Sequence, residues 1–111
     1  MLQAGLFARA RDHIEHRISD PALRPVTVAA ELRVPLRTLQ DVFAQRGQTI
    51  GGYIRELRLE RCNAELQRGT DRTVMEIAFA HGFTNAAHFT RCFRKRYGVT
   101  PRDLRAAATA M

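Results

Sequence analysis

An imperfect internal repeat is the feature that most constrains how this chain of 111 residues folds. Apolar residues of the first half recur 49 or 50 positions later in the second half: Val28-Ala29 as Ile77-Ala78, Val34 as Phe83, Leu39 as Phe89 and Phe43 as Phe93. Each copy reads as a short helix, a turn of three or four residues and a longer helix. This pattern is typical of a helix-turn-helix, so we expect two such motifs.

Glycine and proline divide the chain into seven segments, and none alternates apolar with polar residues as a half-buried strand would. We therefore predict an all-α fold of about seven helices. The first is expected over about Leu6 to Ile18, where Phe7, Ala10, Ile14 and Ile18 form one apolar stripe. The whole chain is expected to be one domain: a first subdomain over about 6–48, a linker helix over about 50–68 and a second subdomain over about 73–108.

Several helix ends carry capping signals. Thr49 is expected to be the N-cap of the linker helix, and Gly69 is expected to end it. Thr100 followed by Pro101 suits the start of the last helix. In the second copy, Thr73 and Glu76 have the spacing of a capping box. Asn85 or Thr84 is expected to cap the helix on which Phe89, Cys92 and Phe93 share one face.

The turns of the two copies differ in the residue that must bend the chain. Gly82 suits a turn with positive φ, whereas the first copy has Arg33 there, after a helix expected over Pro25 to Leu32. An arginine with positive φ costs about 1 kcal/mol.

The positive charge is concentrated in the last third of the chain. The formal net charge is +7, and residues 77–111 carry six basic residues against Asp103, the one acid there. The first 76 residues carry twelve bases against ten acids. Such a basic segment attracts phosphate polyanions or an anionic membrane surface, although it also suits a solvated helix face.

Other chemistries find little support in the sequence. His13 and His16 have a spacing seen in metal sites, but no further ligands complete a set of four. Cys92 is expected on the apolar face with Phe89, and Gly51-Gly52 lacks the spacing of a phosphate-binding loop. We expect no enzyme activity, no metal and no cofactor. Two cysteines and no apolar run of about 18 residues favour a cytoplasmic protein.

The run from Ile77 to Pro101, together with Tyr53-Ile54-Arg55 and Arg58-Leu59, resembles the DNA-binding domain of the AraC/XylS-type bacterial transcription regulators. The resemblance extends from about Phe7 to Arg105. It implies two helix-turn-helix subdomains on a linker helix, each placing one recognition helix in a major groove of promoter DNA.

The resemblance also implies contact residues on each recognition helix. It implies base contacts from Arg37, Gln40, Asn85, Ala86, His88 and Arg91, and phosphate contacts from Thr38, Thr90, Arg94 and Lys95. The first copy departs from the family pattern, since Asp41 stands where arginine is common, Pro35 where serine is common and Arg33 where glycine is common.

The resemblance further implies RNA polymerase as a partner and a preceding sensor and dimerisation domain, so that this chain is the C-terminal part of a longer regulator. It leaves both activation and repression open. The alternative from the residues alone is a helical module that binds another protein or an anionic membrane surface.

Overall fold

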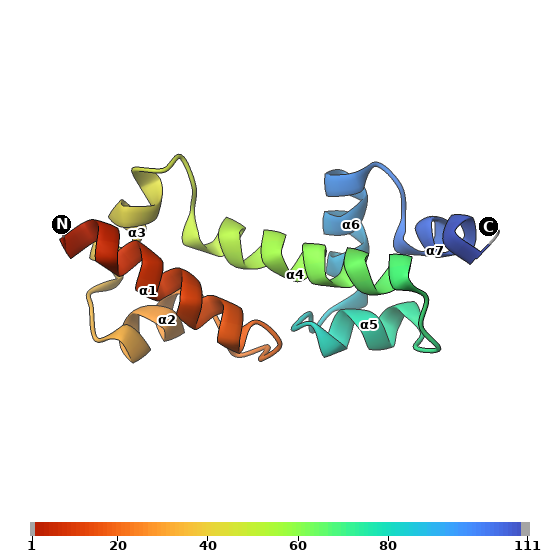
Figure 1. The fold of residues 1–111 in the computed structure, drawn as a ribbon, viewed down its shortest axis with the longest axis horizontal. Helices are drawn as coiled ribbons and strands as arrows, with labels where there is room; N and C mark the ends of the chain where they lie inside the picture. The colour runs from red at the N-terminus through yellow and green to blue at the C-terminus, as the bar shows by residue number, and fades with distance from the viewer. Residues whose placement is uncertain (1, 110–111) are drawn as a thin grey trace. The chain divides into compact units, whose positions relative to one another are not determined.

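The computed structural model describes residues 2–109, which form seven α-helices and no strand (Figure 1). The helices are α1 (Leu2–Arg17), α2 (Pro25–Leu32), α3 (Leu36–Ala44), α4 (Ile50–Arg68), α5 (Val74–Ala80), α6 (Ala86–Tyr97) and α7 (Pro101–Thr109). The predicted all-α fold is confirmed. The chain divides within α4 into two compact units, unit 1 up to Leu57 and unit 2 from Arg58 onward.

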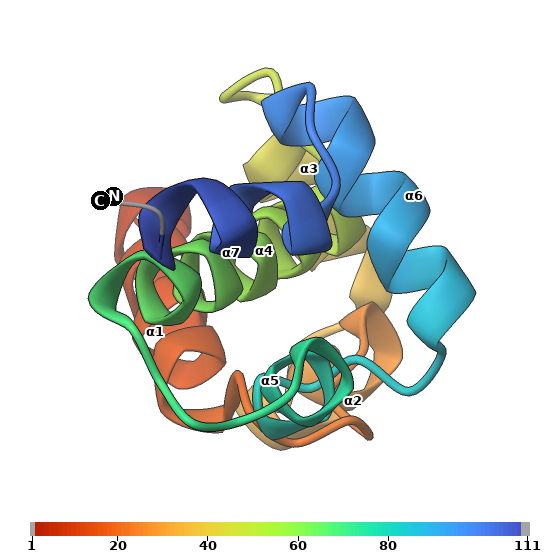
Figure 2. The ribbon, with the colours of Figure 1, turned by 90° about the vertical axis from the view of Figure 1, so that its right-hand side faces the viewer.

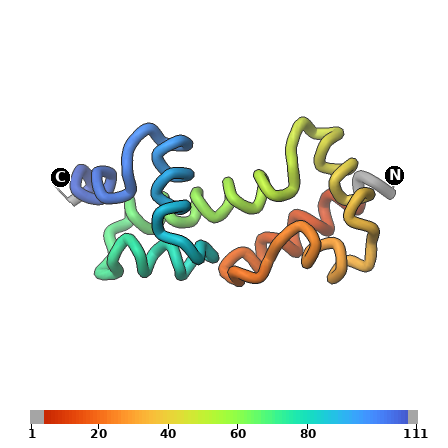
Figure 3. Tube along the Cα trace, turned by 180° about the vertical axis from the view of Figure 1, so that it is seen from behind, coloured from red at the N-terminus to blue at the C-terminus, as the bar shows by residue number. Residues whose placement is uncertain are grey.

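Unit 1 packs α1, α2 and α3 around one apolar core (Figure 3). The predicted stripe of α1 is largely confirmed, because Ala10, Ile14 and Ile18 are buried. Phe7 is half-buried and its ring lies 5.0 Å from that of Phe43. The expected start of this helix near Leu6 was wrong: it begins at Leu2, since no proline or cap precedes Leu6 and a single helical glycine costs only about 1 kcal/mol.

The turn between α2 and α3 depends on a strained arginine. Arg33 has φ +59° and ψ +43°, in the left-handed region. Its N–H donates to the Ala30 carbonyl at 3.1 Å, and the Val34 N–H donates to the Ala29 carbonyl at 3.1 Å. These bonds satisfy the last carbonyls of α2. The first turn therefore has the positive φ for which the sequence places arginine instead of glycine, so the cost of about 1 kcal/mol applies.

Unit 2 packs α5, α6 and α7 around the second half of α4 (Figure 2). Its core contains a row of neighbouring aromatic rings, with centroid distances of 4.9 Å for Phe83 and Phe89 and 5.7 Å for Phe89 and Phe93. Burial raises the pKa of the Cys62 thiol to about 12, and the charge of Glu65 adds to the rise. Cys62 thus stays protonated and acts as a small apolar residue.

The predicted caps are confirmed in both units. The Thr73 hydroxyl accepts from the Glu76 N–H at 3.1 Å, and the Glu76 carboxylate accepts from the Thr73 N–H at 2.8 Å. Thr49 and Thr100 accept from the Gly52 and Asp103 N–H groups at 3.0 and 3.1 Å. Gly82 has φ +98°, as expected for the second turn.

One carboxylate, Glu65 of α4, lies in the interior of unit 2 with only 3% of its surface exposed. Its oxygens lie 2.8 Å from His81 Nε2 and 3.2 Å from Arg72 Nε. Burial acts to raise the pKa of Glu65, but the hydrogen bonds from His81 and Thr70 and the charges of Arg72 and His81 outweigh it. The pKa of the carboxyl is therefore lowered, and Glu65 is ionised at neutral pH.

Replacing Arg33 with glycine is expected to stabilise unit 1 by about 1 kcal/mol, because glycine adopts positive φ without the clash of a Cβ atom. The free energy of unfolding from a denaturant titration measures the change. Ala30→Gly, at an exposed position inside α2, is the control and is expected to destabilise by about 0.5–1 kcal/mol. Destabilisation by Arg33→Gly would show that the arginine side chain stabilises the turn more than its backbone strains it.

The stability of unit 2 is expected to depend on the ionisation of Glu65. Because its folded pKa lies below the ordinary value of 4.5, the ionised carboxylate contributes fully above about pH 4.5, and the contribution is lost as the pH falls through the folded pKa. The difference in unfolding free energy between the natural chain and Glu65→Gln should therefore shrink between pH 7 and pH 3. Glu60→Gln, an exposed carboxylate of the same helix, is the control. A difference that is independent of pH would contradict this account.

Candidate nucleic-acid interface

The packing of α6 determines which of its side chains face solvent. Phe89 and Phe93 are buried in the core of unit 2. Side chains at the helical positions opposite them are exposed: Ala87, His88, Arg91, Arg94 and Lys95. We call these five residues the α6 face. The predicted separation of an apolar side and a basic side is confirmed.

The cations of the α6 face have no acidic partner in the part of the chain that the structure describes. Within residues 2–109, Arg91, Arg94 and Lys95 make no ion pair. Other arginines do: Arg17 pairs with Glu31 and with Asp20, and Arg72 pairs with Glu65. The positive charge of α6 is therefore available to an anion from outside the chain.

The start of α6 combines a cap with a polar surface. The Asn85 Oδ1 accepts from the His88 N–H at 2.9 Å, so Asn85 is the cap and its Nδ2 group is left to donate outward. His88 is exposed, and its Nε2 lies 3.6 Å from the Cys92 sulfur. Ala87 lies on the α6 face but was not among the predicted DNA contacts. Its spacing of four from Arg91 places both residues on one side of the helix, which could have indicated its position.

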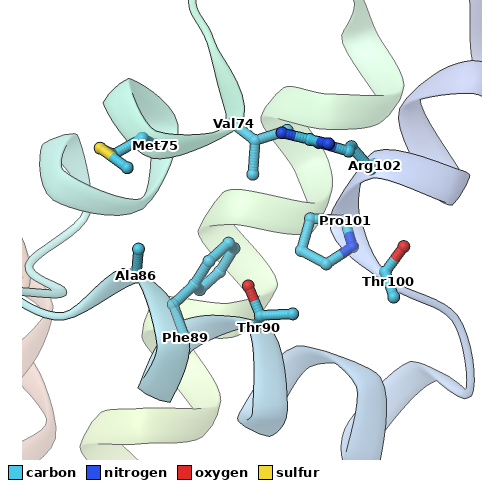
Figure 4. A pocket seen from close by; sticks show the side chains of 8 residues that line it. All are labelled: Val74, Met75, Ala86, Phe89, Thr90, Thr100, Pro101 and Arg102. Carbon is cyan, nitrogen blue, oxygen red and sulfur yellow. The ribbon is translucent and has the colours of Figure 1, made fainter.

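Two of the predicted contact residues, Ala86 and Thr90, lie to one side of the α6 face. Both are half-buried and line a pocket of about 360 Å³ formed by α5, α6 and the start of α7 (Figure 4). Most of the lining comes from apolar side chains, including Val74, Met75 and Phe89. The DNA contacts expected of Ala86 and Thr90 stay predictions.

The corresponding helix of unit 1, α3, presents a less basic surface. Leu39, Val42 and Phe43 are buried, which leaves Arg37, Gln40 and Asp41 exposed and Thr38 half-buried. Arg37 and Asp41 are one turn apart but form no ion pair in the described part of the chain. Gln40 and Asp41 also line a cleft with Arg55 of α4, a lining residue that the helix pattern alone did not indicate.

The histidines of α1 bind partners within unit 1. His13 Nε2 pairs with Glu31, and His16 Nδ1 lies 2.8 Å from the Asp12 carbonyl. Among the described residues, no three side chains of the metal-binding types are grouped to hold an ion. The same residues include no helix long and apolar enough to cross a membrane.

Comparison with known proteins places this geometry in a family. The family model described as a helix-turn-helix domain matches residues 28–107. The chain is 32% identical over 105 residues to the transcriptional activator RhrA of Rhizobium meliloti (strain 1021), covering 94% of this chain and 33% of that protein. It is 35% identical over 101 residues to the HTH-type transcriptional activator RhaS of Escherichia fergusonii, covering 90% of this chain and 34% of that protein. The chain thus spans about a third of the length of these relatives.

Solved structures give the same grouping. A transcriptional regulator of Chromobacterium violaceum, described as containing an AraC-type DNA-binding domain, has a TM-score of 0.78 and 32% identity, covering 89% of this chain and 88% of that one. The C-terminal domain of the response regulator AraT of Geobacillus stearothermophilus has a TM-score of 0.84 and 28% identity, covering 90% of this chain and 83% of that one. With two helix-turn-helix motifs on a shared helix and an exposed basic helix face, the chain belongs to the helix-turn-helix family as an AraC-type DNA-binding domain of a transcription regulator.

Proposed function

We propose that this chain binds a specific site on double-stranded promoter DNA, with α6 in one major groove and α3 in the next. The observation that carries the proposal is the α6 face, where Arg91, Arg94 and Lys95 are exposed and have no acidic partner among the described residues. Recognition helices of helix-turn-helix proteins present such a surface to the groove and the neighbouring phosphates.

On α6, some side chains suit base edges and others suit phosphates. Arg91 lies near the middle of the α6 face, and a guanidinium that donates two hydrogen bonds to guanine is the commonest specific contact. The Asn85 Nδ2 group and the exposed His88 ring suit base edges near the start of the helix, where Ala86 also lies. Arg94 and Lys95, one turn further on, suit phosphates, and Thr90 suits a phosphate at the edge of the face.

On α3, Arg37 and Gln40 are the proposed base contacts, since glutamine pairs with adenine in the major groove. Thr38 suits a phosphate at the start of the helix. Asp41 has no cationic partner among the residues that the structure describes, so it adds a negative charge to this surface, and a carboxylate repels the phosphates on both sides of the groove. We therefore assign most of the affinity to α6.

A membrane-surface role fits the structure less well. An interfacial helix needs a free apolar face, whereas Phe89 and Phe93 of α6 are buried in unit 2. A protein partner has another place to bind: Met75 and Phe79 of α5 are 52% and 45% exposed. Their exposure is compatible with DNA binding by α6.

The role of the whole protein is proposed from its relatives. Because the relatives are named transcriptional activators and are about three times as long, we propose that the chain serves a cytoplasmic activator associated with the bacterial nucleoid, with RNA polymerase as a partner and a sensor and dimerisation domain before it. We propose no catalytic role.

Arg91→Ala is expected to weaken binding to a selected duplex by about 1–3 kcal/mol and to relax base preference at one position, because one bidentate guanine contact is lost. Titration of duplexes recovered from a random library measures both effects. Arg9→Ala, at an exposed arginine of α1, is the control that removes one charge elsewhere. Unchanged affinity and unchanged base preference for Arg91→Ala would refute the assignment.

Asp41→Asn is expected to tighten binding roughly threefold, because a charge about 6 Å from a phosphate costs about 0.7 kcal/mol in water. The gain should be smaller at high salt. Asp71→Asn, at an exposed acid between α4 and α5, is the matched control for a change in net charge. Weaker binding by Asp41→Asn, with a loss of preference at one base pair, would show instead that the carboxylate accepts a hydrogen bond from a base.

A further inference from the structure

We infer that Glu65 is a positioning residue for the recognition helix α6: its buried carboxylate holds His81 and thereby fixes the turn from which α6 begins. The inference rests on the proposed DNA binding. It goes beyond it because Glu65 and His81 are not among the proposed DNA contacts.

The contacts of Glu65 join three segments of unit 2. From α4, one oxygen lies 2.8 Å from His81 Nε2 at the end of α5, and the other lies 3.2 Å from Arg72 Nε in the loop between α4 and α5. The Thr70 side chain of the same loop also hydrogen-bonds to the carboxylate. Arg105 of α7 donates to the Thr70 carbonyl at 2.7 Å, which extends the network to a fourth segment. A carboxylate that is 3% exposed is therefore well satisfied by polar partners.

His81 lies at the start of the turn that connects α5 to α6. It is the C-terminal cap of α5 and is followed by Gly82 with φ +98°. The Phe83 N–H then donates to the Ala78 carbonyl at 3.1 Å, and Asn85 caps α6. Since only three residues separate His81 from the cap of α6, a displacement of His81 changes where α6 starts.

The first copy of the repeat fixes its turn in another way. The residue 49 positions before His81 is Leu32, which packs against the apolar core of unit 1. An apolar contact is not directional, whereas the pairing of Glu65 with His81 requires a donor at a defined place. Unit 2 therefore has a directional anchor at the turn before its more basic helix.

The test compares two substitutions of His81 in the whole chain. His81→Phe fills the space but lacks a donor, and His81→Gln keeps an N–H donor near the position of Nε2. His16→Phe is the matched control, because His16 binds a carbonyl of its own helix in unit 1. The readouts are amide hydrogen exchange at Phe83 and Ile77, and the affinity for a library-selected duplex and for a shuffled duplex of equal length.

For His81→Phe, we expect the Phe83 amide to exchange about tenfold faster, while the Ile77 amide in α5 changes little. We also expect about tenfold weaker binding of the selected duplex. Both changes correspond to the loss of one hydrogen bond to a charged group. Binding of the shuffled duplex should change less than threefold. His81→Gln should restore both readouts to within about threefold.

Three results would overturn the inference: no change of the Phe83 amide in His81→Phe, equal acceleration at Phe83 and Ile77, or equal losses in the Phe and Gln variants. If His81→Phe does not fold, Glu65→Leu takes its place, since it removes both acceptor oxygens from His81. The Phe83 amide should then exchange about tenfold faster while Ile77 changes little, and continued protection of Phe83 would overturn the inference. If the natural chain binds no duplex, the proposed function fails, and the exchange readout alone decides whether Glu65 holds the turn.

Discussion

The burial of one side of α6 and of α3 is the constraint on which the rest of the molecule depends. Phe89 and Phe93 in unit 2, and Leu39 and Phe43 in unit 1, are nearly inaccessible to solvent. Because a helix presents its opposite side when one side is buried, the cations of α6 are forced outward. Each of these aromatic side chains contributes several kcal/mol of stability, so the exposure of Arg91 and Lys95 is a consequence of the core.

The two copies of the repeat share one arrangement of helices but differ in their caps, turn residues and charges. The second has a capping box, a glycine at the turn, the Glu65–His81 anchor, and on α6 the cations Arg91, Arg94 and Lys95, which form no ion pair within the described part of the chain. In the first, the Arg24 side chain makes no cap hydrogen bond, the turn contains a left-handed arginine, and the exposed helix face carries Asp41, which has no cationic partner among residues 2–109. This asymmetry agrees with the proposal that unit 2 supplies most of the affinity for DNA.

The sequence was most informative where a single residue type has a strong backbone preference. Pro25 begins α2 and Gly69 ends α4 after the cap at Thr49, and both helices were predicted with their observed bounds. The end of α2 at Leu32 came from the repeat, because arginine at position 33 has no preference for a turn. The start of α1 was not, since no residue before Leu6 stops a helix. The partial burial of Ala86 and Thr90 depends on how α5 and α7 pack against α6, which helical periodicity does not describe. The pairing of Glu65 with His81, 16 residues apart, likewise has no local pattern.

Two helices, α6 and α3, are proposed to read one duplex, with α6 supplying most of the affinity. The decisive experiment is the selection of bound duplexes from a random library, because the enriched sequences show how many blocks of bases are read. We expect two blocks with centres about 10 base pairs apart, of which the stronger loses its base preference in Arg91→Ala and the weaker in Gln40→Ala. A single enriched block, or a library that shows no enrichment, would contradict it.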